Sequence, residues 1–242
     1  MSYHIPQPVR NALAPNGKIV AAINYGNPVL AQKDAMTGEP RGITADLARE
    51  LARRLGTELE FTTYVTAGLV AKDAPAGRWT VGFLAIDPER AEEIIFTAPY
   101  VQIEGTYMVP KNSPLRRVED VDRKGVRIAL GSKTAYDLYL TRTIQHAELV
   151  HFPTSEEAWE RFLSDGLDAA ASIRQPLVEF AGSHPGLRVM SGRFMAIRQA
   201  MALPQRASAA SGYISDFIEE MKTSGFVAES LRRSGQDDTP PT

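Results

Sequence analysis

The feature that most constrains this chain is an alternation of short apolar runs with helix-period segments. Residues 18–23 are rich in β-branched side chains and precede a turn-forming cluster, as expected of a buried strand. Leucines then recur at intervals of four across residues 47–55, and Gly56 follows the last of them, which predicts a helix. Further strands are predicted at residues 59–64 and 79–84. Strands that alternate with helices predict an α/β fold with a parallel sheet.

The same alternation begins a second time in the middle of the chain. Thr154, followed three residues later by Glu157, has the spacing of a capping box and predicts a helix that runs through residue 163. Because the pattern restarts, we predict two similar lobes. The other elements expected in this half are a strand at 126–130, a turn at 131–136, a helix at 137–144 and strands at 149–152 and 168–173.

The last part of the chain predicts a strand, a helix and a tail. The strand is expected at residues 201–204. Large apolar side chains then recur at intervals of four and predict one long final helix across residues 213–225. We expect the tail at residues 236–242 to be disordered.

The composition removes several classes of chemistry. The chain has 242 residues and no cysteine, which excludes disulfides, thiolate nucleophiles and cysteine-ligated metals. Its 27 Lys and Arg against 29 Asp and Glu leave a net charge of -2, which supplies no basic field for nucleic acid or an anionic membrane surface. Apolar runs such as residues 19–23 fall far short of the roughly 20 residues that span a bilayer. We therefore expect neither a nucleic-acid partner nor a membrane span.

Motifs for cofactors, metals and catalytic nucleophiles are also missing. The turn between Gly125 and Gly131 does not place its lysine where a nucleotide-binding P-loop requires it. G-x-G-x-x-G, G-x-S-x-G and H-E-x-x-H do not occur. We therefore expect no cofactor, no metal site and no catalytic residue. The histidines are expected to be ordinary surface or half-buried residues, and they are His4, His146, His151 and His184.

Two adjacent segments carry a family resemblance. Residues 82–90 read GFLAIDPER and residues 96–100 read FTAPY, which resembles the signature of the periplasmic solute-binding proteins of the polar amino acid class. Residues 42–47 are similar to the start of that family's first helix, and residues 131–137 to its glycine- and threonine-rich turn. The resemblance covers nearly the whole chain, which is identified as a member of this family.

The resemblance implies a type II periplasmic-binding fold. In this fold two α/β lobes, each a mainly parallel sheet flanked by helices, are joined by two crossover hinges and close on a ligand held in the cleft between them. We expect lobe 1 to comprise residues 1–103 and 198–242, and lobe 2 to comprise residues 104–197. The family further implies a monomer, an ABC permease as partner, and a periplasmic location.

The resemblance also assigns residues to the ligand carboxylate. In the family the arginine of the GFLAIDPER motif, here Arg90, forms a bidentate contact with the carboxylate, a task for which a planar guanidinium is suited. The alternative is a surface arginine paired with Asp87 or Glu89. Thr134 and Ala135 occupy the turn that meets the same carboxylate from the other lobe, with a hydroxyl and the amides of a helix N-terminus. Their alternative role is to cap the helix expected at residue 137.

Residues after the first expected strand complete the implied site. Asn24, Tyr25 and Asn27 lie where ligands of open α/β sheets usually bind, and the family often stacks its ligand on an aromatic near here, which favours Tyr25. Tyr25 is alternatively a loop aromatic that covers the lobe, and Gly26 and Asn27 alternatively form only a turn. Ala85 stands where the family often has Thr or Ser, so one expected hydroxyl donor is missing.

The largest departure from the family lies at residue 174. Many members carry there an aspartate that binds the α-ammonium of the ligand, whereas this chain has Arg174. Either another acid such as Glu104 takes that role, or the ligand is not an α-amino acid. If Arg174 faces the ligand and Glu104 does not cancel its charge, the site favours a dicarboxylate or another organic acid. Glu104 is alternatively a hydrogen-bond acceptor at the hinge, and Arg174 alternatively points outward.

Three functions remain open from the sequence. The first is a solute-binding protein that captures an amino acid or organic acid for import. The second is an enzyme that resembles cyclohexadienyl dehydratase, for which Glu104 is the one candidate general acid. The third is a cytoplasmic ligand sensor, because residues 1–10 contain Pro6 and Pro8 and no apolar stretch of the kind an export signal has. A leader removed before residue 1 is the alternative explanation.

Overall fold

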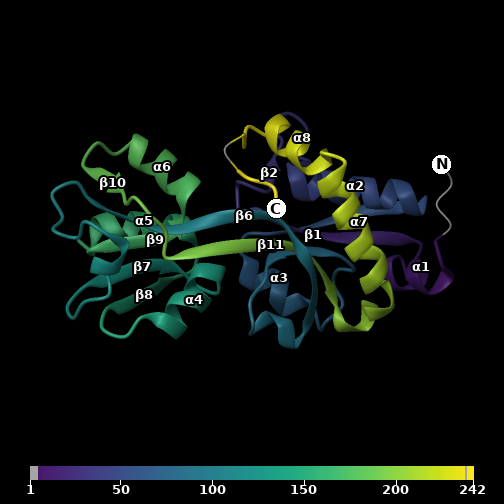
Figure 1. The fold of residues 1–242 in the computed structure, drawn as a ribbon, viewed down its shortest axis with the longest axis horizontal. Coiled ribbons are helices and arrows are strands. Elements are labelled where there is room, and N and C mark those ends of the chain that lie inside the picture. The colour runs from purple at the N-terminus through teal and green to yellow at the C-terminus, as the bar shows by residue number, and fades with distance from the viewer. Residues whose placement is uncertain (1–4, 238) are drawn as a thin grey trace. The chain divides into compact units, whose positions relative to one another are not determined.

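The computed structural model describes residues 5–237 and 239–242. Its contacts divide the chain into two compact units. Unit 1 comprises Met1–Gln102 and Arg198–Thr242, and unit 2 comprises Ile103–Ile197. Strand β6 (Ile94–Pro110) begins in unit 1 and ends in unit 2, and β11 (Met195–Pro204) returns the chain to unit 1 (Figure 1).

The strands of unit 1 follow the predicted pattern. β1 (Lys18–Asn24) pairs in parallel with β4 (Glu58–Tyr64), and a single bridge joins Ala21 of β1 to Val81 just before β5 (Gly82–Ala85). β5 in turn pairs antiparallel with β11. The strand predicted at residues 79–84 begins later, at Gly82; Trp79 before it is fully buried, and its indole N–H donates to Val70 O at 2.9 Å.

The described residues of unit 1 form five helices. α2 (Ile43–Leu55) is the predicted leucine helix, and it ends at Gly56, whose φ of 60° is the left-handed conformation that glycine adopts without strain. The helix predicted at residues 213–225 is α7 (Ser211–Thr223), but it is not the final helix, because α8 (Phe226–Arg233) follows directly after Gly225 and was not predicted. α1 (Gln7–Leu13) was not predicted, and α3 (Ala67–Asp73) follows its N-cap Thr66.

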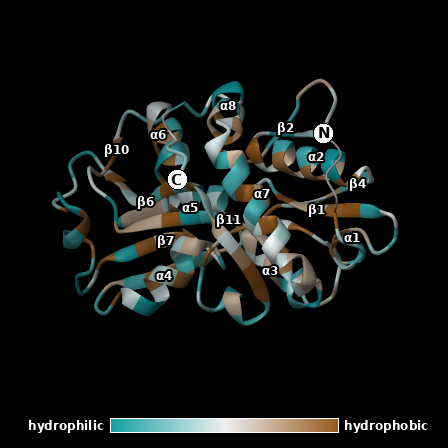
Figure 2. Cartoon of the chain, turned by 45° about the vertical axis from the view of Figure 1, so that its right-hand side comes forward, coloured by the Kyte–Doolittle hydropathy of each residue, from teal (hydrophilic) through white to brown (hydrophobic). Residues whose placement is uncertain are grey.

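Unit 2 is built on a central parallel strand. β7 (Arg127–Gly131) lies between β8 (Glu148–Phe152) and β9 (Ala169–Ile173) and is parallel to both. The end of β6 and strand β10 (Leu187–Val189) continue the sheet antiparallel. The sheets of both units are therefore mixed, and the predicted α/β class is confirmed. Figure 2 colours much of β1 and β7 as hydrophobic, which agrees with their buried positions.

Three helices accompany the strands of unit 2. α5 (Ser155–Ser164) begins as predicted, with Thr154 Oγ1 accepting from Glu157 N at 3.1 Å. α4 (Ala135–Thr143) begins two residues before the predicted start, and α6 (Arg174–Gly182) was not predicted. The short elements of the chain are β2 (Gln32–Lys33), β3 (Pro40–Arg41), η1 (Arg90–Glu92), η2 (Val118–Asp120) and η3 (Gln205–Ala210).

The chain's tail is paired with β6 rather than disordered. Val101 and Pro241 form an antiparallel bridge, and Thr242 N donates to Tyr100 O at 3.3 Å. The expectation of a disordered tail is wrong for residues 236–237 and 239–242, because backbone pairing in unit 1 orders them; residue 238 and His4 lie outside the described residues. Among the helices described, none combines the length and the apolar character that crossing a bilayer requires.

Candidate functional site

Arg90 is a buried cation of unit 1. It begins η1, shortly after β5 ends, and only 5% of it is exposed. Its Nη1 donates to Ala85 O, the last carbonyl of β5, at 3.1 Å. Burial lowers the pKa of the guanidinium to about 10, while the carboxylates of Asp87 and Glu89 act in the opposite direction. Arg90 is therefore charged at neutral pH and is not a surface arginine.

The turn before Arg90 fixes the position of its backbone. Asp87 is buried, and its Oδ1 accepts from Glu89 N at 2.9 Å. The main-chain oxygen of Asp87 accepts from Ala91 N at 3.0 Å. Asp87 thus ties together the residues on either side of Arg90. The motif found in the sequence forms a compact turn that holds the Arg90 guanidinium in a buried position.

Thr134 and Ala135 begin α4 in unit 2. Thr134 is the N-cap: its Oγ1 accepts from Asp137 N at 3.1 Å and donates to Gly131 O at 2.9 Å. The capping role considered from the sequence is therefore present. Ala135 is the first helical residue and is buried. The first amides of a helix have no acceptor within the helix, so this turn is suited to an anion.

Asp137 holds the turn that precedes α4. It is buried, and its Oδ2 accepts from Lys133 N at 2.6 Å, while His151 Nε2 lies 2.8 Å from its Oδ1. Lys133 has a φ of 58°, which costs about 1 kcal/mol for a residue with a side chain. The hydrogen bond to Asp137 stabilises this conformation. The sequence analysis missed Asp137, although its position three residues after Thr134 has capping-box spacing.

The residues after β1 have local roles within unit 1, in a turn and in a pocket. Asn24 Oδ1 accepts from Gly26 N at 3.0 Å, so its side chain serves the turn. Tyr25 lines a pocket of about 410 Å³ in unit 1, and Arg90 is not among the residues that line it. Burial, with a smaller contribution from Glu39, raises the pKa of the Tyr25 phenol. Asn27 is buried, and its Oδ1 has no hydrogen-bond partner among the described residues.

Arg174 and Glu104 form an ion pair within unit 2. Arg174 Nε donates to Glu104 Oε2 at 2.7 Å, and Arg193 Nη1 donates to Glu104 Oε1 at 3.1 Å. The other nitrogens of Arg174 donate to Met190 O, at 3.0 Å, and to Gly192 O. Glu104 therefore pairs with Arg174 and is shared with Arg193. All three guanidinium nitrogens of Arg174 already have acceptors within unit 2.

The ionisation of Glu104 also bears on the enzyme alternative. The hydrogen bond from Arg174 lowers the pKa of the Glu104 carboxyl, partly opposed by burial and supported by Arg193. A general acid near neutral pH needs a raised pKa. Glu104 is instead ionised and engaged by two arginines, so it does not fit the role of a protonated catalytic acid.

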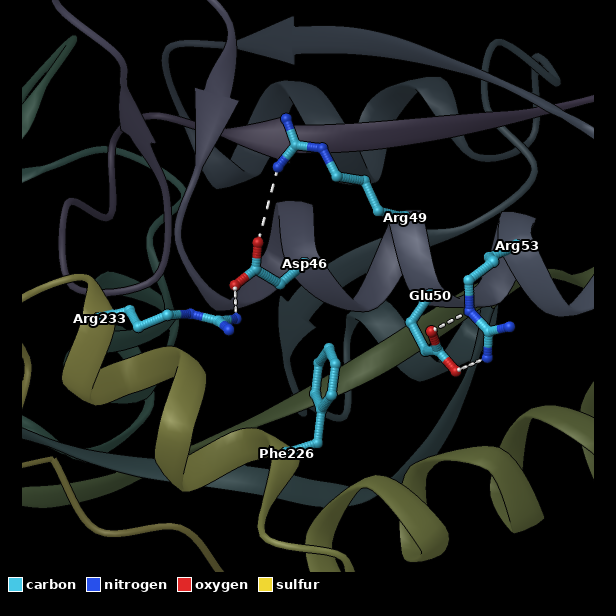
Figure 3. Close-up of a pocket in the computed structure, with 6 residues that line it drawn as sticks. All are labelled: Asp46, Arg49, Glu50, Arg53, Phe226 and Arg233. Atoms are coloured by element: carbon cyan, nitrogen blue, oxygen red, sulfur yellow. Dashed lines mark hydrogen bonds and ion pairs between the residues drawn. The ribbon is translucent and has the colours of Figure 1, made fainter.

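A second pocket of unit 1, of about 220 Å³, lies between α2 and α8 (Figure 3). Phe226 points from the start of α8 toward α2, between two groups of ion pairs. Asp46 lies 3.6 Å from Arg49 and 2.8 Å from Arg233, and Glu50 binds Arg53. Its carboxylates are engaged by the arginines beside them, so this pocket offers little to a charged ligand. In the described part of the chain, no group of three or more His, Asp or Glu is placed to hold a metal ion.

Known proteins resemble this chain in sequence and in fold. The ABC transporter glutamine-binding protein GlnH of Bacillus subtilis (strain 168) is 22% identical over 234 residues, which cover 94% of this chain and 84% of that protein. The solved solute receptor for L-cysteine of Neisseria gonorrhoeae has a TM-score of 0.80 at 22% identity and covers 92% of each chain. The substrate-binding protein AbpA of Streptococcus pneumoniae, solved with L-arginine, has a TM-score of 0.78 at 19% identity, covering 94% of this chain and 98% of its own.

The structural likenesses confirm the type II periplasmic-binding fold expected from the sequence. The family model for bacterial extracellular solute-binding proteins, family 3, matches residues 19–235. The matched range includes the two segments that carry the motif, residues 82–90 and 96–100, and it also includes the turn at Thr134. The chain therefore belongs to the bacterial extracellular solute-binding proteins of family 3.

Proposed function

We propose that this solute-binding protein captures a free amino acid for an ABC importer and holds its carboxylate with Arg90. The observation that carries the proposal is the burial of Arg90 in a turn that the sequence motif builds. A guanidinium that is already desolvated and held in place loses little hydration and little conformational freedom when it binds a ligand. Its hydrogen bonds to a carboxylate are also stronger in such surroundings. Thr134 and Ala135 of unit 2 contribute backbone amides to the same carboxylate, and the Thr134 hydroxyl contributes when its proton turns from Gly131 O to the ligand.

An amino acid is a better candidate than a dicarboxylate. The nitrogens of Arg174 already donate to Glu104, Met190 O and Gly192 O, so they are not free to bind a second carboxylate of a dianion. The relatives compared above are named for glutamine and L-cysteine or were solved with L-arginine, which supports the same class. The family's description as extracellular supports a periplasmic location and a membrane permease as partner.

Binding without chemical change follows from the same features. The relatives are named as binding proteins or receptors, and the one acid considered for catalysis, Glu104, is an ionised partner of Arg174. We therefore propose a receptor rather than a dehydratase.

The proposal is tested by thermal shift and calorimetry with L-glutamine, L-cysteine, L-arginine, L-glutamate and succinate. A ligand that binds only the folded chain raises the melting temperature. Arg90→Ala should lower the affinity for the tightest-binding amino acid by about 100-fold, which corresponds to the loss of roughly 3 kcal/mol of charge-assisted hydrogen bonds. Arg78→Ala is the matched control, because Arg78 is an exposed arginine of the same unit, 3.6 Å from Asp73. Unchanged affinity in Arg90→Ala, or stabilisation by succinate alone, would contradict the proposal.

A further inference from the structure

The turn that begins α4 contains the one residue other than glycine with a positive φ in the described part of the chain. Lys133 has a φ of 58°, in the left-handed region that residues with a Cβ avoid because it crowds the following carbonyl oxygen. It lies between the end of β7 and Thr134, the N-cap of α4. Such residues persist only where their surroundings hold them, and they cluster at functional sites.

Lys133 changes the direction of the chain in a single step. The residue before it still belongs to the sheet, because Ser132 N donates to Phe152 O at 2.8 Å. Lys133 N donates instead to Asp137 Oδ2, at 2.6 Å. The next two amides, those of Thr134 and Ala135, have no acceptor among the residues that the structure describes. The conformation of Lys133 therefore sets the direction of two amides that are free to bind an anion.

Two further side chains hold the Asp137 carboxylate in the orientation that serves Lys133. Thr141 Oγ1, one turn further along α4, donates to Asp137 Oδ1 at 3.1 Å, and His151 Nε2 on β8 lies 2.8 Å from the same oxygen. Because a carboxylate only accepts hydrogen bonds, Nε2 is the ring nitrogen that donates. With Oδ1 held from α4 and from β8, the buried carboxylate keeps Oδ2 directed at Lys133 N.

The charge of Asp137 and its hydrogen bond to Lys133 act on a bound anion with opposite signs. The negative charge repels a ligand carboxylate at the first amides of α4, whereas a turn that is already fixed favours binding. Three donors compensate the charge of Asp137, which weakens the repulsion. We therefore expect the fixed turn to be the larger effect.

We propose that Asp137 is a positioning residue for the ligand carboxylate and is itself held by His151 and Thr141. It keeps Lys133 in the left-handed conformation, so that the amides of Thr134 and Ala135 are in place before a ligand binds. This inference rests on the proposed function, because it takes the turn at Thr134 as a contact of the ligand carboxylate. It adds side chains that set the affinity without touching the ligand.

A double-mutant cycle at residues 133 and 137 tests this proposal. L-Glutamine, L-cysteine and L-arginine are titrated by calorimetry into wild type, Asp137→Ala, Lys133→Gly and the double variant. For the amino acid that wild type binds most tightly, Asp137→Ala should lower the affinity by about tenfold, because binding must then order the turn. Glycine adopts a positive φ without strain, so Asp137→Ala should cost less than about twofold in the Lys133→Gly background.

Glu157→Ala is the matched control for the loss of an acid near a helix N-terminus. Glu157 is the third residue of α5, as Asp137 is of α4, and its amide likewise donates to the N-cap hydroxyl at 3.1 Å. Glu157 is exposed and belongs to the same unit. Glu157→Ala should therefore keep the wild-type affinity.

Milder variants carry the test if Asp137→Ala does not fold. Thr141→Val and His151→Phe each remove one donor to Asp137 and should each lower the affinity by about threefold, because the carboxylate is then held less firmly. The His151 side chain is 42% exposed, so its replacement leaves no buried cavity. His146→Phe, at an exposed position of the same unit, should leave the affinity unchanged.

Tighter or unchanged binding in Asp137→Ala would overturn the proposal, because the charge would then outweigh the turn. An equal loss with and without Lys133→Gly would also overturn it, since Asp137 would then act through general stability. Wild-type affinity in both Thr141→Val and His151→Phe would remove their part in it. Arg90→Ala is measured beside these variants: unchanged affinity there contradicts the function proposed above and leaves the cycle readable, whereas no binding of any of the three amino acids to wild type overturns both.

Discussion

Glu50 of α2 is expected to make unit 1 sensitive to acid. Its carboxylate binds Arg53 at 2.7 Å and Arg54 at 2.8 Å, and Arg54 binds Glu220 of α7 at 2.6 Å. The Glu50 side chain is only 15% exposed. The hydrogen bond from Arg53 is the largest cause that lowers the pKa of Glu50 from 4.5 to about 2, with Arg54 acting alike and burial acting against them. Arg54 joins α2 to α7 through Glu220, and the partly buried Glu50 binds the same arginine.

The sign and size of the effect follow from this pKa. A group whose pKa is lower in the folded state adds stability above its unfolded pKa of 4.5, and that stability is lost as the pH falls toward about 2. A shift of this size corresponds to about 3 kcal/mol at most. Since Arg53 is 67% exposed, solvent screening reduces the expected value to about 1–2 kcal/mol.

The assay compares wild type and Glu50→Gln by urea unfolding, because urea does not screen charges. The sequence has 2 tryptophans, so a Trp159→Phe background leaves buried Trp79 as the reporter of unit 1. Glu50→Gln should be less stable by about 1–2 kcal/mol near pH 7, and the difference should shrink near pH 3. Glu58→Gln, at an exposed position of β4, is the control. A difference that stays constant as the pH falls would refute the reasoning.

Two further predictions concern unit 2. Gly105→Ala would place a Cβ 2.9 Å from the ring of Phe194 and 3.0 Å from Met195 Cγ, so thermal unfolding should show a loss of about 1–3 kcal/mol; an unchanged melting temperature would disprove this close contact. Thr134→Ala and Thr154→Ala each remove an N-cap and should cost about 1 kcal/mol of stability, whereas only Thr134→Ala should also weaken amino acid binding, by about tenfold. If calorimetry gives the two variants the same affinity for the amino acid, Thr134 serves only as a helix cap.

Elements with long or repeated patterns were predictable from the sequence. The leucines of α2 and the capping threonine of α5 act within a few residues, so local spacing reveals them. The helices that were missed, α1, α6 and α8, have 7, 9 and 8 residues, too few for a clear period. Gly225 was correctly associated with a helix end, but the sequence does not show that a helix resumes at once.

The candidate site was predictable only where a motif is local. Arg90 lies within one contiguous segment, and the family resemblance marked it before its burial was known. The partners of Arg174 lie 70 residues away at Glu104 and in the segment that contains Met190, so no local spacing connects them.

The pairing of the tail with β6 has a practical consequence for anyone who labels this protein. Thr242 N donates to Tyr100 O, and its hydroxyl donates to Pro99 O at 2.5 Å, so a purification tag or fluorophore fused there begins inside a backbone pairing. Such a fusion disturbs the strand that leads into unit 2. The hairpin tip at Met36, which is 96% exposed, offers an attachment point that displaces no packed neighbour. A cysteine introduced there would be unique, because the chain has none of its own.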